Sequence, residues 1–575
     1  MLRRIFSYMK EYKKYAWLAL ICIGVEVVLE IMVPKLMADL IDIGVTNSDV
    51  PYIINKGIQM AVCAVAALIL GVGSARFSAL AGQGLGANIR KAEYEKLQSY
   101  SFSNIDHFSV SSLVTRLTSD VTNIQNAVST GMRPFGRSPV MLIFATTLAF
   151  QINSTLALVF LVALPVLAVM LIIIIINVGP RYGRMQGAVD LVNRCIEENL
   201  TAVRVVKSYV RGDYEIEKFR NVNDNLKNES EKAFGIAVLN MPAMQFVMYG
   251  TILGILLIGG RLINSGQMMI GQLTSFLSYV LLILNSLMMM SNVFLLMTRS
   301  LASAERIMKV IDEPIDITDE NARNIEVKKG EIEFNHVWFK YKDTAKEYVL
   351  SDVSFHINAG QTVGIIGQTG SSKTTLIQLI PRLYDASKGE IKIDGISIKE
   401  YPVRHLRDAI SVVLQKNTLF SGSLIDNLRW GDENATLDEI KEACSIACVD
   451  EFIDRLPGGF DAEMGQKGVN VSGGQKQRIC IARAILKKPK VLILDDSTSA
   501  VDTATEGKIR NALAKELPDM TKIIIAQRIS SVRHADQIII MDGGCVNAIG
   551  THESLLKTNK IYQEIYESQK EGADL

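Results

Sequence analysis

The fold of the C-terminal half of this 575-residue chain is decided by the stretch Thr362-Val363-Gly364-Ile365-Ile366-Gly367-Gln368-Thr369-Gly370-Ser371-Ser372-Lys373-Thr374. An apolar, strand-like run leads into a glycine-rich loop, and a helix-like run over 376–380 follows the loop. Backbone N–H groups of such a loop, together with the helix N-terminus, form a site for phosphate oxygens. Strand and helix patterns alternate from about residue 331 onward, which predicts an α/β domain with a largely parallel sheet.

The loop supplies two side chains with distinct chemistry. Lys373 can neutralise the terminal phosphates of a nucleotide, and the Thr374 hydroxyl can coordinate Mg²⁺. The strict P-loop pattern places Gly directly before the lysine, whereas this chain has Ser372. A side chain at that position either crowds the phosphate path or points outward, and the sequence leaves both readings open.

Two further elements in the same half indicate phosphate and metal chemistry. An apolar strand over 490–495 ends in Asp495, and an acid in that position lies at the carboxyl edge of a sheet, near the metal. Between the loop and this strand lies Val471-Ser472-Gly473-Gly474-Gln475. This run is either a surface turn with a glycine pair or a second phosphate-binding nest at a helix start.

The first half of the chain predicts a membrane domain. Hydrophobic residues make up 49% of the chain and the mean hydropathy is +0.21, which is high for a wholly soluble protein. A spanning helix needs about 20 apolar residues. Six spans are predicted, over 15–37, 57–80, 137–152, 155–178, 236–263 and 273–298. The third is the weakest prediction because Arg133 and Arg137 lie at its start.

The positions of lysine and arginine orient these spans. Basic residues precede the first span, and the long polar segments 81–133 and 179–233 carry both signs of charge, whereas 151–154 and 264–272 carry no Lys or Arg. The positive-inside rule then places both termini and both long segments in the cytoplasm, and the protein in the cell membrane. With 61 basic and 60 acidic residues, no global field favours nucleic acid, so we expect no nucleic-acid partner.

The order of these elements resembles that of an ABC transporter half of the type IV exporter class. The resemblance covers nearly the whole chain and includes the SGGQ signature at 472–475, Gln415 after an apolar run, and Ser499-Ala500-Val501-Asp502 after the Asp495 strand. Tyr341 matches the aromatic residue on which adenine stacks in that family. The resemblance implies a six-helix membrane domain over 1–320, followed by a P-loop ATPase domain over 321–575. The segments 112–118 and 198–207 resemble the two cytosolic coupling segments of the family.

The resemblance also implies a two-chain nucleotide site. In that family two ATPase domains hold two ATP molecules head to tail, so each ATP contacts the P-loop of one chain and the signature of the other. The implied Mg²⁺ ligands here are Thr374, Gln415 and Asp495. The implied ATP contacts are Tyr341, Gly367, Thr369, Gly370, Ser371, Ser372, Lys373, Thr374 and Thr375, with Ser472, Gly473, Gly474 and Gln475 completing the partner's site.

Two catalytic positions depart from the family pattern. Hydrolysis-competent members carry Glu directly after the metal-binding Asp, where this chain has Asp496, and a switch histidine where it has Gln527. A side chain one methylene shorter retracts the carboxylate by about 1 Å, and misplacements of that size can cost about 10²-fold in rate. Glutamine can donate a hydrogen bond but has no positively charged form.

These departures favour one half of an asymmetric heterodimer. The chain's own site would retain ATP and hydrolyse it weakly, while the intact signature would serve a partner half with the usual Glu and His. The alternatives are a fully active homodimeric exporter, in which the departures are drift, and an ATP-gated channel or regulatory membrane subunit.

The predicted spans contain candidate substrate contacts. Glu26 and Glu30 lie one turn apart in the first span, which indicates a site for a small cationic, amphipathic substrate, a position near the outer leaflet, or pairing with another helix. The last span contributes Met288, Met289 and Met290, and the fifth contributes Met241, Met244 and Met248; these side chains provide either an adaptable surface or ordinary membrane packing. Asn292 either lines a polar cavity or joins helices.

Overall fold

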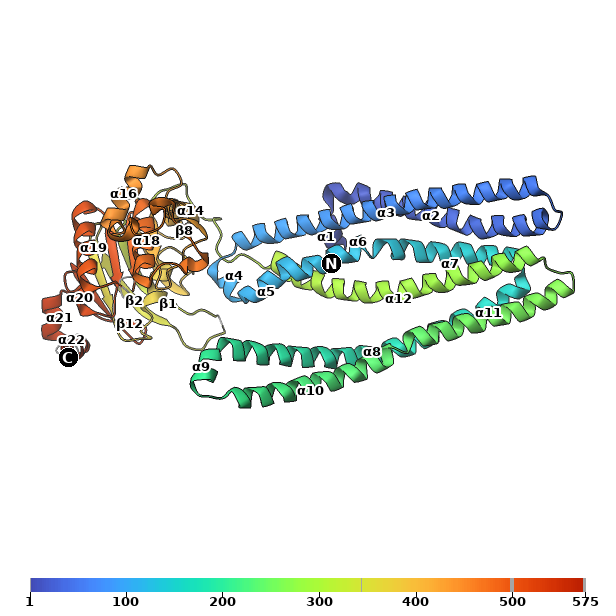
Figure 1. Ribbon diagram of the computed structural model, residues 1–575. Coiled ribbons are helices and arrows are strands. Elements are labelled where there is room, and N and C mark those ends of the chain that lie inside the picture. Colours follow the sequence, from blue (N-terminus) through green and yellow to red (C-terminus); the bar gives the residue numbers. More distant parts are fainter. Residues whose placement is uncertain (1, 343, 497–500, 572–575) are drawn as a thin grey trace. The chain divides into compact units, whose positions relative to one another are not determined.

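The computed structural model describes residues 2–342, 344–496 and 501–571 (Figure 1). The chain divides into two compact units. The first unit comprises Met1–Leu97 and Ser111–Asp312, and the second comprises Gln98–Val110 and Glu313–Leu575. The first is helical and the second contains the β-sheets, so the predicted order of a helical domain followed by an α/β domain is confirmed.

Long helices build the first unit, and several continue far beyond the length of a membrane span. Its helices are α1 (Leu2–Ser7), α2 (Lys13–Asp39), α3 (Val50–Gln98), α5 (Val110–Thr115), α6 (Val121–Ser129), α7 (Met132–Ile152), α8 (Ser154–Thr201), α9 (Val203–Ser208), α10 (Gly212–Ala237), α11 (Asn240–Asn264) and α12 (Ile270–Asp312). Because a helix rises 1.5 Å per residue, the 49 residues of α3 span more than twice the hydrocarbon core of a bilayer. The predicted polar segments 81–133 and 179–233 therefore begin as continuations of α3 and α8, which end at Gln98 and Thr201.

Five helical stretches in the described part of the chain are long and apolar enough to cross a membrane. They are Lys10–Val45, Val50–Gln98, Val110–Ile152, Gly212–Asn264 and Ile270–Met290. The predicted fourth span lies in α8, where Ser154–Met170 forms a shorter apolar stretch. The count of six spans therefore stays a prediction.

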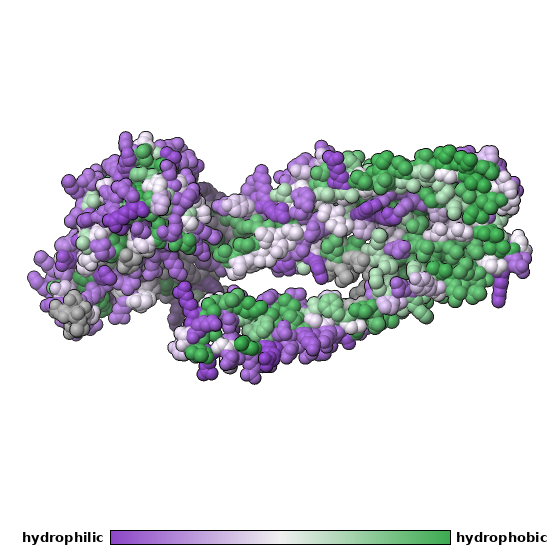
Figure 2. Space-filling view, viewed as in Figure 1, coloured by the Kyte–Doolittle hydropathy of each residue, from purple (hydrophilic) through white to green (hydrophobic). Residues whose placement is uncertain are grey.

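The apolar parts of α2, α7, α8, α11 and α12 share one hydrophobic core. Small residues such as Ala145 and Ala149 in α7 are fully buried, which lets neighbouring helices approach closely. Tyr279 in α12 is also fully buried, and its hydroxyl donates to the carbonyl oxygen of Ile31 in α2 at 3.0 Å. Figure 2 shows hydrophobic side chains gathered over the part of the first unit that holds α2 and α11, and hydrophilic ones over the second unit.

The second unit contains a six-stranded sheet in the order β12-β11-β3-β10-β9-β6. Neighbouring strands from β11 to β6 pair in parallel, and β12 pairs antiparallel to β11, so the predicted, largely parallel sheet is confirmed. The strands are β3 (Thr362–Ile366), β6 (Ile410–Val413), β9 (Val491–Asp495), β10 (Thr521–Ile525), β11 (Gln537–Asp542) and β12 (Cys545–Gly550). Because β3, β6, β9 and β10 are parallel, the loops that follow them meet at one edge.

This unit also contains a four-stranded antiparallel sheet, a two-stranded sheet of β7 (Gly422–Ser423) and β8 (Glu463–Met464), and a group of helices. The four-stranded sheet has the order β2 (Leu350–Ile357), β1 (Ile332–Phe339), β4 (Lys388–Ile393) and β5 (Ile396–Ser397). The helices are α4 (Phe102–Asp106), α13 (Lys373–Leu379), α14 (Val403–Asp408), α15 (Leu424–Arg429), α16 (Leu437–Ile446), α17 (Asp450–Ile453), α18 (Gly473–Leu486), α19 (Thr503–Glu516), α20 (Ile529–Val532), α21 (His552–Thr558) and α22 (Lys560–Glu571).

The short helix α4 belongs to the second unit although it lies early in the chain. The side chain of Ser101 caps it by accepting from the N–H of Asn104, whose own side chain donates to the carbonyl oxygen of Pro314 at 2.7 Å. The hydroxyl of Tyr384 donates to Asp106 at 2.7 Å. The predicted first coupling segment, 112–118, lies instead in the first unit, because it continues the helical path of α5.

Candidate nucleotide site

The glycine-rich loop joins β3 to α13, as the sequence predicts. A Cβ atom on Gly367 would lie 2.2 Å from the carbonyl oxygen of Met541, so only glycine fits there. Ser372 occupies the N-cap position of α13 in a left-handed conformation, with φ of 67° and ψ of 23°, and its side chain makes no capping hydrogen bond. The loop therefore requires at this position the backbone conformation that glycine adopts most easily, and serine holds it at a cost of about 1–2 kcal/mol.

Lys373 lies over the loop from which it projects. Its Nζ donates to the carbonyl oxygens of Gly367 and Gln368 at 2.8 Å each, and to Ser371 Oγ at 3.2 Å. Burial lowers the pKa of Lys373, and the neighbouring carboxylates of Asp495 and Asp496 oppose that shift. The loop thus holds a desolvated ammonium group at the point where phosphate oxygens would bind.

Asp495 ends β9 at the carboxyl edge of the sheet and is 2% exposed. The hydroxyl of Thr374 donates to its Oδ1 at 3.2 Å, while its Oδ2 is buried without a hydrogen-bond partner among the described residues. Burial raises the pKa of Asp495, and the contacts with Thr374 and Lys373 oppose this. A buried carboxylate oxygen without a donor, beside a threonine hydroxyl, fits the oxygen ligands that Mg²⁺ prefers.

Asp496 and Gln527 face one another across the same edge. The Nε2 of Gln527 donates to Asp496 Oδ2 at 2.9 Å, and Asp496 takes a left-handed backbone conformation with φ of 47°. Burial raises the pKa of Asp496, and hydrogen bonds from Gln415 and Gln527 oppose that rise. The two positions that depart from the family pattern are therefore direct partners.

A cavity of about 330 Å³ unites these residues. It is lined by Thr369, Gly370, Ser371, Ser372, Lys373, Thr374, Thr375, Gln415, Asp495, Asp496, Ile525 and Gln527. Tyr341 lies next to it, because its hydroxyl is 2.9 Å from Thr375 Oγ1 and its side chain is 43% exposed. The structure thus brings most of the predicted P-loop, metal and catalytic residues to one cavity, and sequence reasoning missed the apolar wall at Ile525.

The signature run lies apart from this cavity. Ser472 caps α18, since its Oγ accepts from the N–H of Gln475 while the Gln475 side chain accepts from the N–H of Ser472 at 2.9 Å. Ser472 and Gly473 are exposed at the helix start, and none of the run 472–475 is among the residues that line the cavity. The structure therefore gives the predicted helix-start geometry. Of the motif 499–502, Ser499 and Ala500 lie outside the described residues.

The two candidate acids of the first span are paired with arginines from α7. Arg133 Nη2 donates to Glu26 Oε1 at 2.6 Å, and Arg137 Nη2 lies 2.5 Å from Glu30 Oε2. Arg137 also reaches Glu26 Oε1 at 3.4 Å. Glu26 and Glu30 therefore pair with another helix, which is one of the predicted alternatives, and the role of these residues toward a cationic substrate stays a prediction.

The structure brings together four of the six methionines of the predicted surface, and Met289 and Met290 are not among the residues that line their cavity. Met288 in α12 and Met241, Met244 and Met248 in α11 line a cavity of about 180 Å³, together with Gln245, Asn285, Leu284 and Leu167. Thioether side chains adapt their shape to irregular apolar ligands, and they also fill irregular gaps in cores. The side chain of Asn292 lies outside the described residues.

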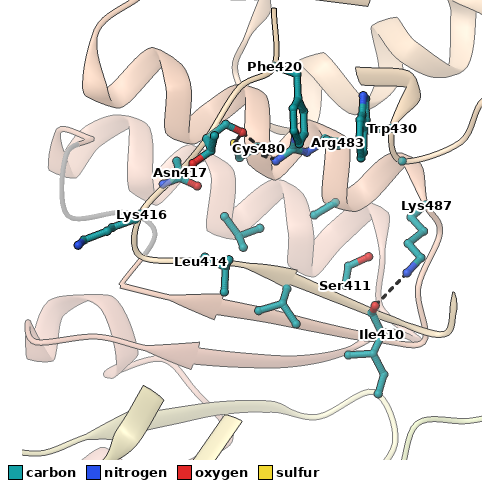
Figure 3. A pocket seen from close by; sticks show the side chains of 15 residues that line it. Ile410, Ser411, Leu414, Lys416, Asn417, Phe420, Trp430, Cys480, Arg483 and Lys487 are labelled. Atoms are coloured by element: carbon teal, nitrogen blue, oxygen red, sulfur yellow. Dashed lines mark hydrogen bonds between the residues drawn. The ribbon is translucent and has the colours of Figure 1, made fainter. Parts of the chain in front are cut away.

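A second cavity in the ATPase unit was missed at the sequence level (Figure 3). Phe420 and Trp430 stack at its mouth with ring centroids 4.1 Å apart, and Trp430 is 64% exposed. Ser411 Oγ and Arg483 Nη1 are buried there without hydrogen-bond partners among the described residues. The spacing of these residues in the sequence does not predict a common cavity, because β6, α15 and α18 come together only in the folded protein.

Comparison with known proteins agrees with this geometry. The family described as ABC transporter transmembrane region matches residues 16–287, and the ABC transporter family matches residues 350–499. The uncharacterized ABC transporter ATP-binding protein YfiB of Bacillus subtilis is 37% identical over 575 residues, covering 100% of both chains. An ATP-dependent lipid A-core flippase of Pseudomonas putida is 32% identical, covering 98% of this chain and 95% of its own.

A solved structure shares the fold. The structure of a bacterial Atm1-family ABC exporter with ATP bound matches with a TM-score of 0.82, at 22% sequence identity, and covers 98% of each chain. With a helical membrane domain, a P-loop ATPase domain and relatives of full length, this chain belongs to the ABC transporter family.

Proposed function

We propose that this chain is one half of an ATP-driven exporter that moves amphipathic compounds such as drugs, lipids or peptides out of the cytosol. In this proposal the membrane domain is residues 1–320 and the ATPase domain is residues 321–575, with both termini and the ATPase domain in the cytoplasm. The flippase name of a full-length relative supports a lipid-like substrate class.

The nucleotide half of the proposal rests on the cavity at the carboxyl edge of the sheet. Bound there, ATP with Mg²⁺ would supply the binding energy that holds two ATPase domains closed. Lys373 would hold the terminal phosphates, and Thr374, Gln415 and Asp495 would hold the metal. Tyr341 would stack on adenine, since its ring is exposed and its hydroxyl anchors to Thr375 beside the loop.

We further propose that this site binds ATP but hydrolyses it weakly. The observation that carries this is the 2.9 Å hydrogen bond from Gln527 to Asp496. A carboxylate oxygen that accepts a hydrogen bond from Gln527 is less available to take a proton from water. The shorter side chain of Asp496 and the uncharged Gln527 add to this loss.

The intact signature supports a partner chain. Ser472–Gln475 forms a capped, exposed helix start that lies apart from the chain's own cavity, so it is available to a second ATPase domain. We propose that the partner is an exporter half with the usual Glu and His.

Two preparations test the proposal. The chain purified alone should bind Mg·ATP and hydrolyse it slowly, whereas the complex with its natural partner should hydrolyse ATP briskly. Brisk hydrolysis by the chain alone, lost on Asp496→Asn, would instead indicate an active homodimer. Uptake of a fluorescent amphiphile into inverted vesicles against its gradient would exclude a channel, because a channel does not concentrate its solute.

A further inference from the structure

A cavity in the first unit has arginines as its charged wall. It has a volume of about 480 Å³ and includes Arg133, Arg137 and Pro134 from α7 and Met289, Val293 and Leu296 from α12. Its remaining lining residues, Thr130 and Gly131, carry no charge. We name it the arginine cavity.

The carboxylates that pair with these arginines line a different cavity. Glu26 and Glu30 border a space of about 720 Å³, which Arg133 and Arg137 also border, together with apolar residues such as Leu68 and Leu281. Neither glutamate is among the residues that line the arginine cavity. Arg133 and Arg137 therefore border both cavities, whereas the two glutamates border only the larger one.

Exposure of the four charges is unequal. The side chain of Glu26 is 5% exposed, that of Arg137 is 17% exposed and that of Glu30 is 33% exposed, whereas 41% of the Arg133 side chain is exposed. Arg133 donates to Glu26 from Nη2, and a guanidinium carries five N–H donors in a planar fork. Although the quartet is formally neutral, the two arginines are the charged residues that line the arginine cavity, so its charged lining is positive.

We propose that Arg133 binds the anionic head group, a phosphate or carboxylate, of an amphiphile whose apolar part lies against Met289, Val293 and Leu296. This deepens the proposed export function by naming the substrate class, and it rests on that function. A planar guanidinium suits such an anion because two parallel N–H groups can donate to two of its oxygens. The apolar wall supplies the hydrophobic contact for the tail.

The experiment measures binding of radiolabelled dodecyl phosphate to the purified full-length chain in an uncharged detergent. The test variant is Arg133→Gln with Glu26→Gln, because removing both charges avoids a buried unpaired carboxylate that would destabilise the fold. We expect about tenfold weaker binding, since a charge-assisted hydrogen bond contributes on the order of that factor. Glu26→Gln alone should bind the probe more tightly, because Arg133 then lacks its counter-charge.

Two further probes distinguish the contribution of the anionic head group to binding from that of the apolar tail. Inorganic phosphate should compete weakly, and dodecyltrimethylammonium should bind weakly, with no loss in the double variant. The proposal is overturned if the double variant binds dodecyl phosphate as the wild type does, if inorganic phosphate binds equally well, or if the cationic probe binds more tightly.

Nucleotide binding in the same samples separates the two proposals. If the variants bind Mg·ATP normally and the substitution of Arg133 leaves dodecyl phosphate binding unchanged, only the inference about the substrate class is wrong. A chain that fails to bind Mg·ATP contradicts the proposed function itself. Arg261→Gln, at the end of α11 and not among the residues lining either cavity, is the matched control for removing one arginine.

Discussion

Gln527 and Asp496 are hydrogen-bonded, with Gln527 Nε2 donating to Asp496 Oδ2 at 2.9 Å. The residue in the place of the family's general base thus has as its partner the residue in the place of the switch histidine. Gln415 also bonds Asp496, so three side chains from the loops after β6, β9 and β10 form one small network.

Asp496→Glu combined with Gln527→His should increase hydrolysis at this site by roughly 10²-fold. The longer carboxylate regains about 1 Å of reach toward the attacking water, and histidine can carry positive charge toward the terminal phosphate. Single-turnover hydrolysis in the complex with the partner measures the change. Lys373→Ala added to the pair should abolish the gain, and an unchanged rate in the double variant would contradict a degenerate site.

Ser372→Gly should stabilise the loop by about 0.5–1 kcal/mol, because glycine holds the left-handed conformation at φ of 67° without the Cβ clash. Thermal melts with and without Mg·ATP measure the gain. Ser372→Ala is the control, since alanine loses the hydroxyl but keeps the Cβ and should not stabilise. If Ser372→Gly and Ser372→Ala changed the thermal stability equally, the loss of the hydroxyl, and not the backbone conformation, would determine the stability at this position.

Asp495→Asn should raise the thermal stability of the chain at pH 7 without nucleotide or Mg²⁺. Burial raises the pKa of Asp495 in the folded protein above its ordinary value of 3.8. Between these two pKa values the folded state binds a proton that the unfolded state has released, so the free energy of unfolding falls as pH rises through this range. Above the pKa of Asp495 in the folded protein, the full cost of burying its charge lowers the free energy of unfolding. The advantage of the variant should therefore vanish below about pH 3.8, and melts across this range test it. If the gain in thermal stability of Asp495→Asn did not depend on pH, burial of the Asp495 charge would not be its cause.

Ser472→Ala should cost about 1 kcal/mol of stability, because it removes the N-cap of α18. Ser472→Asn preserves a capping oxygen and should melt like the wild type. If Ser472→Asn nevertheless lowers ATP hydrolysis in the complex with the partner, the serine contacts the partner's nucleotide. Normal hydrolysis by a stable Ser472→Asn complex would contradict that role.

Much of the nucleotide site could be predicted from sequence because its parts are local. A glycine-rich loop between a strand and a helix defines its own backbone geometry, so Gly367, Lys373 and Thr374 lie where the pattern predicts. Asp495 at the end of an apolar strand was equally predictable, because parallel strands bring their carboxyl ends to one edge. The long helical continuations of the spans also follow from local pattern.

Only the tertiary structure decided which distant side chains meet. The sequence contains Glu26, Glu30, Arg133 and Arg137, but which acids pair with which bases depends on how α2 packs against α7. The same holds for Gln527 with Asp496, which lie 31 positions apart on neighbouring strand ends. Local sequence determines local hydrogen bonding, whereas these contacts form only after sheets and helices pack, because their partners approach through buried apolar surfaces far from either residue.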